Sequence, residues 1–342
     1  MPKIDPDALP KTRTLTPKQA RAAMIPLPPA PFQPSPEHVR AGLDALLGQL
    51  LVAARGEASD AFLSARLTDA HAIGFDLEIW QVGASRYWAL FELAAERRGA
   101  GSYVLRVGPP ARAHAEVILQ TPHVFFDRGT SNIAAEIFFG SLGPTPARGF
   151  YANTAHRYGG PDSSEEDRDD SESDVCHIDA HEFHTATDVA ARVLPSVIFV
   201  QLHGYADQPN LPTIIISSGD QPSPLVRAMA DELRAHFDAV GVYPDDVSTL
   251  GGTQNAQRQL LDSYPHAEFV HLELSADTRK ALRRSPALRA ALSTVLLRER
   301  ALGGADPAGT SDRGDGQPAQ PRPEPDDTAS GQRDQPSSRL GS

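Results

Sequence analysis

The side chains of this sequence that are best suited to chemistry are histidines and carboxylates that follow apolar stretches. His123 comes directly after EVILQTP, and Asp127 lies four residues further on. His203 ends the apolar stretch SVIFVQL, and Glu273 lies near the end of EFVHLEL. Zinc on imidazole and carboxylate ligands activates water, and a separate carboxylate can carry the proton from that water to a leaving amine. The pattern therefore predicts one Zn²⁺ per chain on His123, Asp127 and His203, with Glu273 as general acid and base.

The composition points to the same kinds of ligand. The 342 residues include 12 histidines but a single cysteine, so neither a disulfide framework nor a zinc knuckle of several thiolates can form within one chain. A protein-bound metal is then expected on His, Asp and Glu. The 44 acidic and 32 basic residues give a formal net charge of −12, which argues against general binding to phosphate backbones or anionic membranes. We expect no nucleic-acid partner and no membrane partner.

Apolar stretches alternate with amphipathic ones along the middle of the chain. Strands are expected at 75–82, 87–93, 102–107, 116–120, 150–154, 196–202, 213–217, 240–244 and 268–274, and helices at 39–54, 132–140, 186–194, 224–237, 276–283 and 286–299. This alternation predicts an α/β fold with a single mixed, mostly parallel sheet, covered by helices on both faces, and with antiparallel strands near the N-terminus. Because ligands of such sheets bind beyond the carboxyl ends of the strands, the residues named above are expected to share one edge.

Three segments are expected to be disordered. Residues 1–35 are rich in proline, which disfavours regular helix, and residues 301–342 hold too few apolar side chains to offset the entropy of ordering. Residues 161–174 carry eight acidic side chains against one arginine and are expected to form a solvated insertion. The folded domain is then 36–300. The sequence shows no stretch typical of a secretory signal or a membrane span, so a cytoplasmic location is expected.

Four short segments occur in an order that resembles a known family. They are PHVFFDRGT (122–130), LHG (202–204), GGTQN (251–255) and HLELS (271–275). Together they resemble the N-formylglutamate amidohydrolase-like proteins and, more distantly, the poly-γ-glutamate hydrolases, both of which are similar in fold to zinc carboxypeptidases. The resemblance spans about residues 115–285 and implies a zinc-exopeptidase-like core.

The resemblance also implies roles for individual residues. It puts the metal on the early pair His123 and Asp127 and on the later His203, and the general acid and base on Glu273. The HxxxD spacing of the early pair differs from the HxxE of zinc carboxypeptidases, so Asp127 would reach the metal from a different turn. The resemblance further implies residues that lie near the substrate's carboxylate, namely Asn153, Arg157, Asn255 and Arg258. An arginine can bind such a carboxylate bidentately.

Other polar residues leave alternatives open. His177, His181 and His184 would share one face if CHIDAHEFH were helical, which suggests a second metal or, for His184, a contact with substrate. Alternatively, these histidines are polar residues that line the cleft of the predicted metal site. A metal-free hydrolase would have to use Ser218 or Cys176 as its nucleophile.

The residues and the resemblance together predict a zinc-dependent amidohydrolase or peptidase. Its expected substrate is a small molecule or peptide with a carboxylate, such as an N-acylated or γ-linked glutamate. The alternative is a catalytically inactive relative that serves as a binding or regulatory module.

Overall fold

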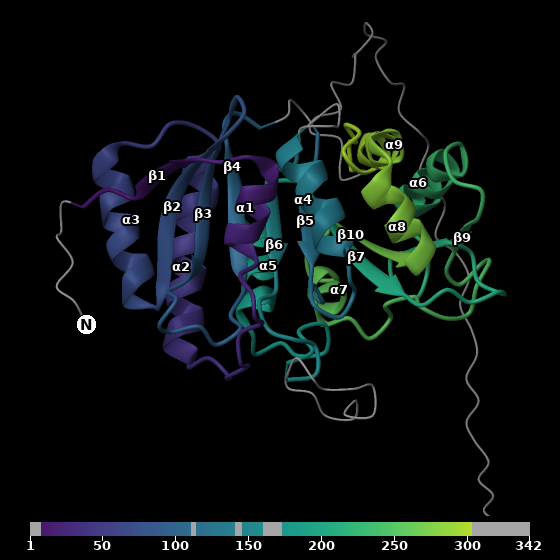
Figure 1. The fold of residues 1–342 in the computed structure, drawn as a ribbon, viewed down its shortest axis with the longest axis horizontal. Helices are drawn as coiled ribbons and strands as arrows, with labels where there is room; N and C mark the ends of the chain where they lie inside the picture. Colours follow the sequence, from purple (N-terminus) through teal and green to yellow (C-terminus); the bar gives the residue numbers. More distant parts are fainter. Residues whose placement is uncertain (1–7, 111–113, 141–145, 160–172, 303–342) are drawn as a thin grey trace, which may run out of the picture. The chain divides into compact units, whose positions relative to one another are not determined.

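The computed structural model describes residues 8–110, 114–140, 146–159 and 173–302, and these residues form the fold shown in Figure 1. By its internal contacts the chain divides into Met1–Gly304 and Ala305–Ser342, of which only the first contains described residues. Most of the expected tail at 301–342, and residues 161–172 of the expected acidic insertion, therefore lie outside the described residues.

The described strands form one mixed sheet. In sheet order they are β1 (Lys11–Thr14), β2 (Phe75–Val82), β3 (Ser85–Glu92), β4 (Ser102–Val107), β6 (Gly149–Ala152), β5 (Glu116–Thr121), β7 (Val197–Tyr205), β10 (Ala267–Ser275), β8 (Ile214–Ser217) and β9 (Val240–Val242). Strands β6, β5, β7 and β10 run parallel, whereas β2, β3 and β4 form an antiparallel meander. The predicted α/β architecture, with antiparallel strands near the N-terminus, is confirmed.

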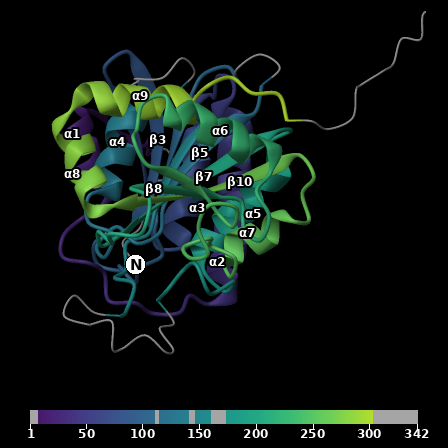
Figure 2. The same cartoon turned by 90° about the vertical axis from the view of Figure 1, so that its right-hand side faces the viewer.

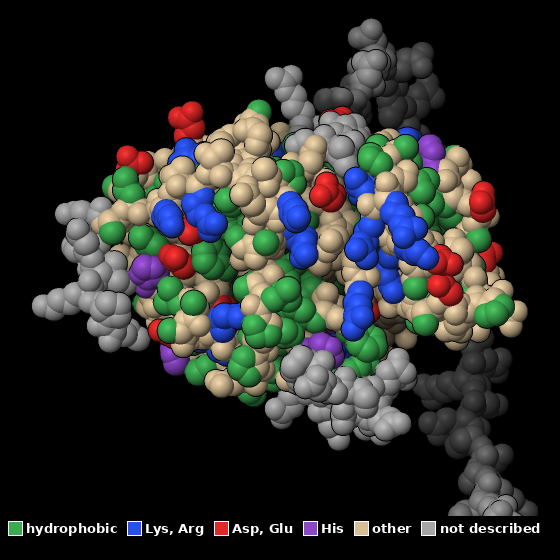
Figure 3. All heavy atoms as spheres, viewed as in Figure 1, with side chains coloured by type: hydrophobic (Ala, Val, Ile, Leu, Met, Phe, Trp, Pro, Cys, Tyr) green, Lys and Arg blue, Asp and Glu red, His purple; other side chains and the backbone are tan. Residues whose placement is uncertain are grey.

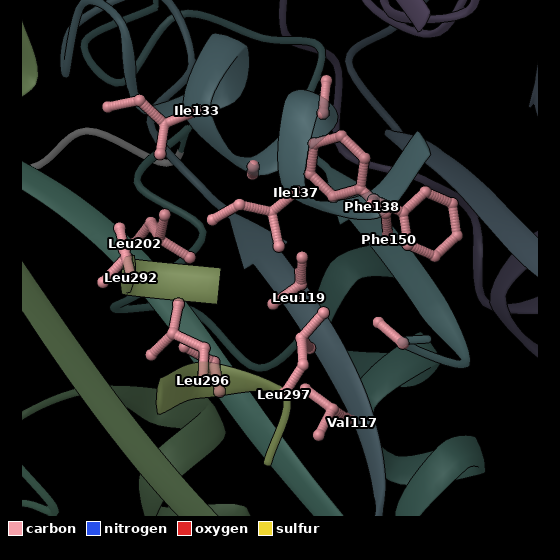
Figure 4. Packing of buried hydrophobic residues seen from close by; sticks show 14 of the residues in the cluster. Val117, Leu119, Ile133, Ile137, Phe138, Phe150, Leu202, Leu292, Leu296 and Leu297 are labelled. Carbon is pink, nitrogen blue, oxygen red and sulfur yellow. The ribbon is translucent and has the colours of Figure 1, made fainter. Parts of the chain in front are cut away.

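Helices cover both faces of the sheet (Figures 1 and 2). One face carries α1 (Pro17–Met24), α4 (Thr130–Gly140), α6 (Pro224–Arg234), α8 (Ala276–Arg284) and α9 (Pro286–Leu296). The other face carries α2 (Glu37–Ala54), α3 (Asp60–Ala72), α5 (Glu182–Val193) and α7 (Ala256–Leu261). Figure 4 shows how the first layer packs, with Ile137 of α4 next to Leu119 of β5 and with Ile133 and Leu296 in the same cluster. Within the described residues, no helix is both long enough and apolar enough to cross a membrane.

The alternation of side chains along the central strands explains where polar groups gather. In β7, Ile198, Val200 and Leu202 belong to the core below α4 and α9, while Val197 and Phe199 belong to the core below α2 and α5. Strands β5 and β10 alternate in the same way. Because successive side chains point to opposite faces, the polar residues that end these strands continue the α2/α5 face. In β7 and β10 that face is apolar in the first half of the strand and polar toward the carboxyl end.

The expectation of a disordered tail is wrong for residues 8–35. Residues 11–14 add a strand to the edge of the sheet, parallel to β2. Helix α1 follows, and Thr16 begins it with a capping box that includes Gln19. The prolines do not prevent this, because Pro17 lies in the first turn of α1, where its missing N–H has no helical partner to lose. The folded part therefore begins well before the predicted residue 36.

Candidate metal centre

The site lies at the carboxyl ends of three adjacent parallel strands. The polar residues involved are Gln120 of β5, Gln201 and His203 of β7, and His271 and Glu273 of β10. Gln201 lies opposite both Gln120 and His271 in the sheet, and Glu273 lies opposite His203. Paired residues of parallel strands share a face, so all five side chains are on the α2/α5 face. Of the residues predicted to share one edge of the sheet, His203 and Glu273 are placed side by side by this register.

The turn after β5 brings a histidine and a carboxylate to the same place. Asp127 N–H donates to the His123 carbonyl at 2.7 Å, and Thr130 N–H donates to the Asp127 carbonyl at 3.1 Å, so the four-residue spacing closes one tight turn before α4. The Oδ2 atom of Asp127 lies 3.5 Å from Nδ1 of His123. It also lies 3.4 Å from Nδ1 of His203. The HxxxD spacing thus lets Asp127 reach both imidazoles.

Each imidazole is held on its outer nitrogen by an oxygen. Nε2 of His123 lies 2.8 Å from Oδ1 of Asp174, and Nε2 of His203 lies 2.7 Å from Oε1 of Gln201. Carboxylate and amide oxygens accept hydrogen bonds, so Nε2 carries the proton in both rings. The Nδ1 atoms are then left with lone pairs directed toward Asp127. Oxygen partners of this kind orient the histidine ligands of metals and fix their tautomers.

The electrostatics of these residues favour a cation at their centre. Burial alone would lower the pKa of His123, but Cys176, Asp127 and Asp174 beside it raise that pKa well above its usual value. Burial and the neighbouring His271 lower the pKa of His203 to about 4. Burial would raise the pKa of Asp127, but the two imidazoles outweigh it and hold the carboxyl ionised. The charges around His123 and Asp127 therefore favour a cation where the donor atoms converge.

The donor atoms fit a zinc ion. His123 and Asp127 are each 2% exposed, and neither Nδ1 of His123 nor Oδ2 of Asp127 has a hydrogen bond. Tetrahedral zinc bonds of about 2.0–2.1 Å place neighbouring donors about 3.3 Å apart, close to the observed 3.5 and 3.4 Å. Among the described residues, Cys176 also converges here, since its Sγ and one nitrogen from each of His123 and His203 lie within 4.8 Å of one another.

A buried network of side-chain amides supports the site from behind. Oε1 of Gln201 accepts from Nδ2 of Asn255 at 2.6 Å as well as from His203. Nε2 of Gln201 donates to Gln120 at 3.1 Å and to Gln257 at 3.3 Å. All these side chains are buried, so each contact also satisfies a group that would be costly to leave unpaired. The network fixes which end of Gln201 faces His203.

A cavity of about 870 Å³ opens above the site. Asp127, His203 and Glu273 line it together with Arg157 and Arg279. Oε1 of Glu273 lies 3.3 Å from Nε2 of His271, while its Oε2 is buried without a hydrogen bond. Glu273, two arginines and two of the predicted metal ligands therefore face one space of a size that holds a small molecule.

The two arginines differ in how they are held. Arg157 donates from Nε to Oδ2 of Asp174 at 2.8 Å. Arg279 donates from Nη1 to the Leu274 carbonyl at 2.7 Å, and its Nε is buried without a hydrogen bond. The guanidinium of Arg279 lies directly over Gly204, where a Cβ atom would meet Nη1 at 1.6 Å. The glycine of the LHG segment thus makes room for a cation beside the metal centre.

The other residues predicted near the substrate lie elsewhere. Asn153 is buried, and its side chain bonds the backbone of Ala155. Asn255 begins α7 and reaches Gln201, so it supports the site from behind. Arg258 pairs with Asp262 one turn along α7 and with Asp220, and it does not line the cavity. His184 lies on α5 and does not line the cavity either. Of the predicted carboxylate-binding residues, the cavity contains Arg157 alone.

The three histidines of CHIDAHEFH do not share a helix face. His177 lies in a turn before the helix, where its Nδ1 contacts Oδ2 of Asp174 at 3.0 Å, and it lines the cavity. His181 begins α5 as its N-cap, and only His184 lies within the helix. The shared helix face on which a second metal was expected is absent, because helical geometry starts after His181, and among the described residues these three do not form a converging donor group.

The structure adds residues that the sequence prediction missed. Asp174 was assigned to a disordered insertion, yet it is 5% exposed and bonds His123. Cys176 was considered only as a nucleophile, and Gln201 and Arg279 were not singled out. The signal available for Asp174 was its position at the end of the acidic run, directly before the apolar Val175 and Cys176.

The sequence matches no protein-family model and no curated protein. Among solved structures, the chain is similar to a succinylglutamate desuccinylase from Vibrio parahaemolyticus, with 17% identity over 68% of this chain and 81% of that one and a TM-score of 0.40. It is also similar to a metallo-carboxypeptidase from Burkholderia cenocepacia (14% identity, 57% and 58% of the two chains, TM-score 0.32). A third similar structure is an aspartoacylase family protein from Mesorhizobium loti, with 9% identity over 64% of this chain and 68% of that one and a TM-score of 0.36. The function proposed below rests on the site itself.

Proposed function

We propose that this chain is a zinc-dependent hydrolase that cleaves an amide bond in a small substrate bearing a carboxylate, of the N-acyl or γ-glutamyl type. One observation carries the proposal. Two buried imidazoles are each fixed on Nε2 by an oxygen, and both direct Nδ1 at the same carboxylate oxygen of Asp127. Such an arrangement leaves buried donor atoms without hydrogen bonds unless a cation joins them.

His123, Asp127 and His203 are the residues that would hold the metal. Zinc in such a site lowers the pKa of a water molecule to about 7 and polarises a carbonyl. Asp174 and Gln201 keep the two imidazoles in the tautomer that the metal requires. Three protein donors leave a position for water and substrate, as in catalytic zinc sites.

Glu273 is the group that would move the proton. It lies opposite His203 in the sheet and lines the same cavity, so it is close to the metal position without being part of the His–Asp–His set. Its Oε2, which has no hydrogen bond, can accept a proton from water and return it to the departing amine. His271 holds the other oxygen, Oε1, and thereby orients the carboxylate.

Two arginines among the residues that line the cavity offer binding groups for an anionic substrate. Arg279 carries a buried Nε without a hydrogen bond, which can bind a carboxylate together with a second donor of the same guanidinium. Arg157 lines the same cavity. On the face drawn in Figure 3, Lys and Arg side chains also gather over α8, although the whole chain has a net charge of −12. The substrate-binding charge is thus proposed to be carried by Arg279 and Arg157.

The test uses the substitution Glu273→Gln, which keeps the size of the side chain and removes its basicity. We expect zinc to stay at one ion per chain, while turnover of N-acyl- or γ-glutamyl-linked substrates falls by about 10²–10⁴-fold. Glu268→Gln is the matched control, since Glu268 lies on the same strand but outside the cavity. Elemental analysis and the release of free amine give the two readouts. Protein without zinc, or a Glu273→Gln variant with full turnover, contradicts the proposal.

A second candidate is a thiol hydrolase. Cys176 lies close to His123, which in turn bonds Asp174, the order of groups found in cysteine hydrolases. Burial, however, raises the pKa of the Cys176 thiol, and its Sγ lies 3.6 Å from Oε1 of Gln201 as a hydrogen-bond donor. A protonated, buried thiol is a poor nucleophile. Turnover that survives chelators but not thiol alkylation would favour this candidate. Ser218 is excluded geometrically, since its hydroxyl bonds the carbonyl of Gln221 and does not line the cavity.

An inactive relative that only binds a partner is the remaining alternative. It would retain its binding function and thermal stability in a His123→Ala variant, because no metal would be needed for either. The metal-dependent proposal expects that variant to lose zinc.

A further inference from the structure

A second cavity lies where the first turns of α4 meet α8 and α9. It has a volume of about 230 Å³, and we call it the α8 cavity. Its lining residues are Asn132, Ile133, Glu136, Arg283 and Arg289. None of these five residues lines the cavity above the metal centre, which Arg279 reaches from the preceding turn of α8. Two guanidinium groups and one carboxylate leave the α8 cavity with a formal positive charge.

The close approach of Gly129 places Arg283 at this cavity. Gly129 directly precedes α4 and has a φ of +99°, which favours glycine. A Cβ atom there would lie 3.1 Å from Cδ and 4.0 Å from Nη1 of Arg283. The missing side chain thus lets the arginine lie across the turn before α4. Because the N–H groups of a first helical turn carry positive partial charge, the guanidinium lies beside a second source of positive potential.

Arg289 is fixed in place with part of its donor capacity unused. Its Nη1 donates to the Leu282 carbonyl at 2.6 Å and to the Arg283 carbonyl at 3.0 Å, both in the last turn of α8. Its Nε is buried and has no hydrogen bond. A guanidinium that the protein already orients loses little conformational freedom when it binds an anion.

The arginines of this region lack carboxylate partners. Within the described part of the chain, no ion pair joins Arg283, Arg289 or Arg21 of α1 to an acidic side chain. Lys280 of α8 does pair, with Asp277 at 3.8 Å. Burial and the charge of Arg283 lower the pKa of Arg21, so these two guanidinium groups repel each other. Figure 3 shows the gathering of Lys and Arg side chains over α8, where a bound anion would relieve this repulsion.

Glu136 selects the kind of anion that fits the α8 cavity. Its carboxylate repels an anion that only accepts hydrogen bonds, but it accepts a hydrogen bond from an oxyanion that still carries a proton. Inorganic phosphate retains an O–H group at neutral pH, whereas sulfate does not.

We propose that the α8 cavity binds a proton-bearing oxyanion, of which inorganic phosphate is the simplest. Arg283 and Arg289 hold its negative oxygens by charge-assisted hydrogen bonds, and Glu136 accepts from its O–H group. The site goes beyond the proposed hydrolase activity, since no step of that reaction uses it.

Calorimetric titration of the full-length chain with inorganic phosphate tests the site. We expect a Kd below about 1 mM. Arg283→Gln removes a charged donor and should weaken binding at least about tenfold. Arg284→Gln is the matched control, because Arg284 is the next residue of α8, is exposed and does not line the cavity, and its Kd should equal that of the unsubstituted chain. Neither variant should change the zinc content or the turnover.

Sulfate tests the role of Glu136. We expect phosphate to bind at least about tenfold more tightly than sulfate. Glu136→Gln should reduce this preference, because a side-chain amide can donate to either anion. Equal affinities of the unsubstituted chain for the two anions contradict the selection by Glu136.

The remaining outcomes separate this site from the metal centre. Phosphate binding that survives in Arg283→Gln but is lost in Arg279→Gln would put the anion in the cavity above the metal centre and overturn the proposal. A chain that shows no phosphate binding at millimolar concentrations overturns it as well. Neither result affects the metal-dependent function. A chain without zinc whose phosphate binding depends on Arg283 would overturn that function and leave the anion site standing.

Discussion

The N-cap of α5 makes the stability of this protein depend on pH. His181 is 2% exposed, its Nδ1 accepts from Phe183 N–H at 2.9 Å, and its Nε2 lies 3.1 Å from the Gly99 carbonyl. These two contacts require a neutral ring with its proton on Nε2. A second proton would occupy Nδ1 and break the cap. Burial accordingly lowers the pKa of His181 to about 4.

The size of this pH effect on the free energy of unfolding follows from the difference between the pKa values of His181 in the folded and unfolded chain. An unfolded histidine titrates near 6.5, so between about pH 6.5 and pH 4 the unfolded chain binds the proton and the folded protein does not. The stability that the neutral ring contributes is therefore complete at pH 8 and decreases as the pH falls. With each pH unit worth about 1.4 kcal/mol, His181 alone lowers the free energy of unfolding by about 2 kcal/mol between pH 8 and pH 5.

Urea denaturation at pH 8, 6.5 and 5, with chelator present to remove metal effects, measures this loss. His181→Asn keeps a side-chain oxygen that can cap α5 but does not titrate. We expect the free-energy difference between the unsubstituted chain and this variant to shrink by about 2 kcal/mol from pH 8 to pH 5. His38→Asn is the control, because His38 is exposed, and it should follow the unsubstituted chain. If the His181→Asn variant loses as much stability as the unsubstituted chain, the reasoning is refuted.

Two substitutions near the cavity give sharp expectations. Gly204→Ala puts a Cβ at 1.6 Å from Nη1 of Arg279 and so displaces the guanidinium. The kcat/KM for a carboxylate-bearing substrate should then fall about 10–100-fold. Gly48→Ala, whose Cβ meets no atom closer than 3.7 Å, is the control and should leave kcat/KM unchanged. An unchanged kcat/KM in Gly204→Ala would remove Arg279 from substrate binding. Asp174→Asn replaces the charged acceptor of His123 and should weaken zinc binding about 10–100-fold. Competition with a chromophoric chelator measures this affinity. An affinity equal to that of the unsubstituted chain would mean that Asp174 does not orient His123.

The fold could be predicted where hydrophobic periodicity is strong. Strands β2 and β4 begin and end at the predicted residues, and the apolar stretches of β7 and β10 were placed within a few residues. Helix α7 was missed because its six residues are too few for a periodic pattern. Strand β1 and helix α1 are not predicted, because a high density of proline indicates disorder, although proline is compatible with the start of a helix.

The candidate site could be predicted in part for a topological reason. His123, His203 and Glu273 were found because residues that end neighbouring parallel strands must lie close together. Arg258 was misplaced because spacing does not reveal that Asp262, one turn along the same helix, pairs with it. Asp174 depends on a long-range contact, 51 residues from His123 in sequence, that no local pattern reports.

The N-terminal strand also protects the sheet from self-association. An open strand edge can pair with the edge of another molecule, and short or charged edge strands discourage this. The two ends of this sheet are β1, four residues of KTRT that are largely exposed, and β9, three residues long. Behind β1 lies β2, an eight-residue strand of mostly buried side chains. Removing the proline-rich N-terminal segment would turn FDLEIWQV into an open edge, and the shortened protein would then be prone to aggregation and to amyloid-like stacking.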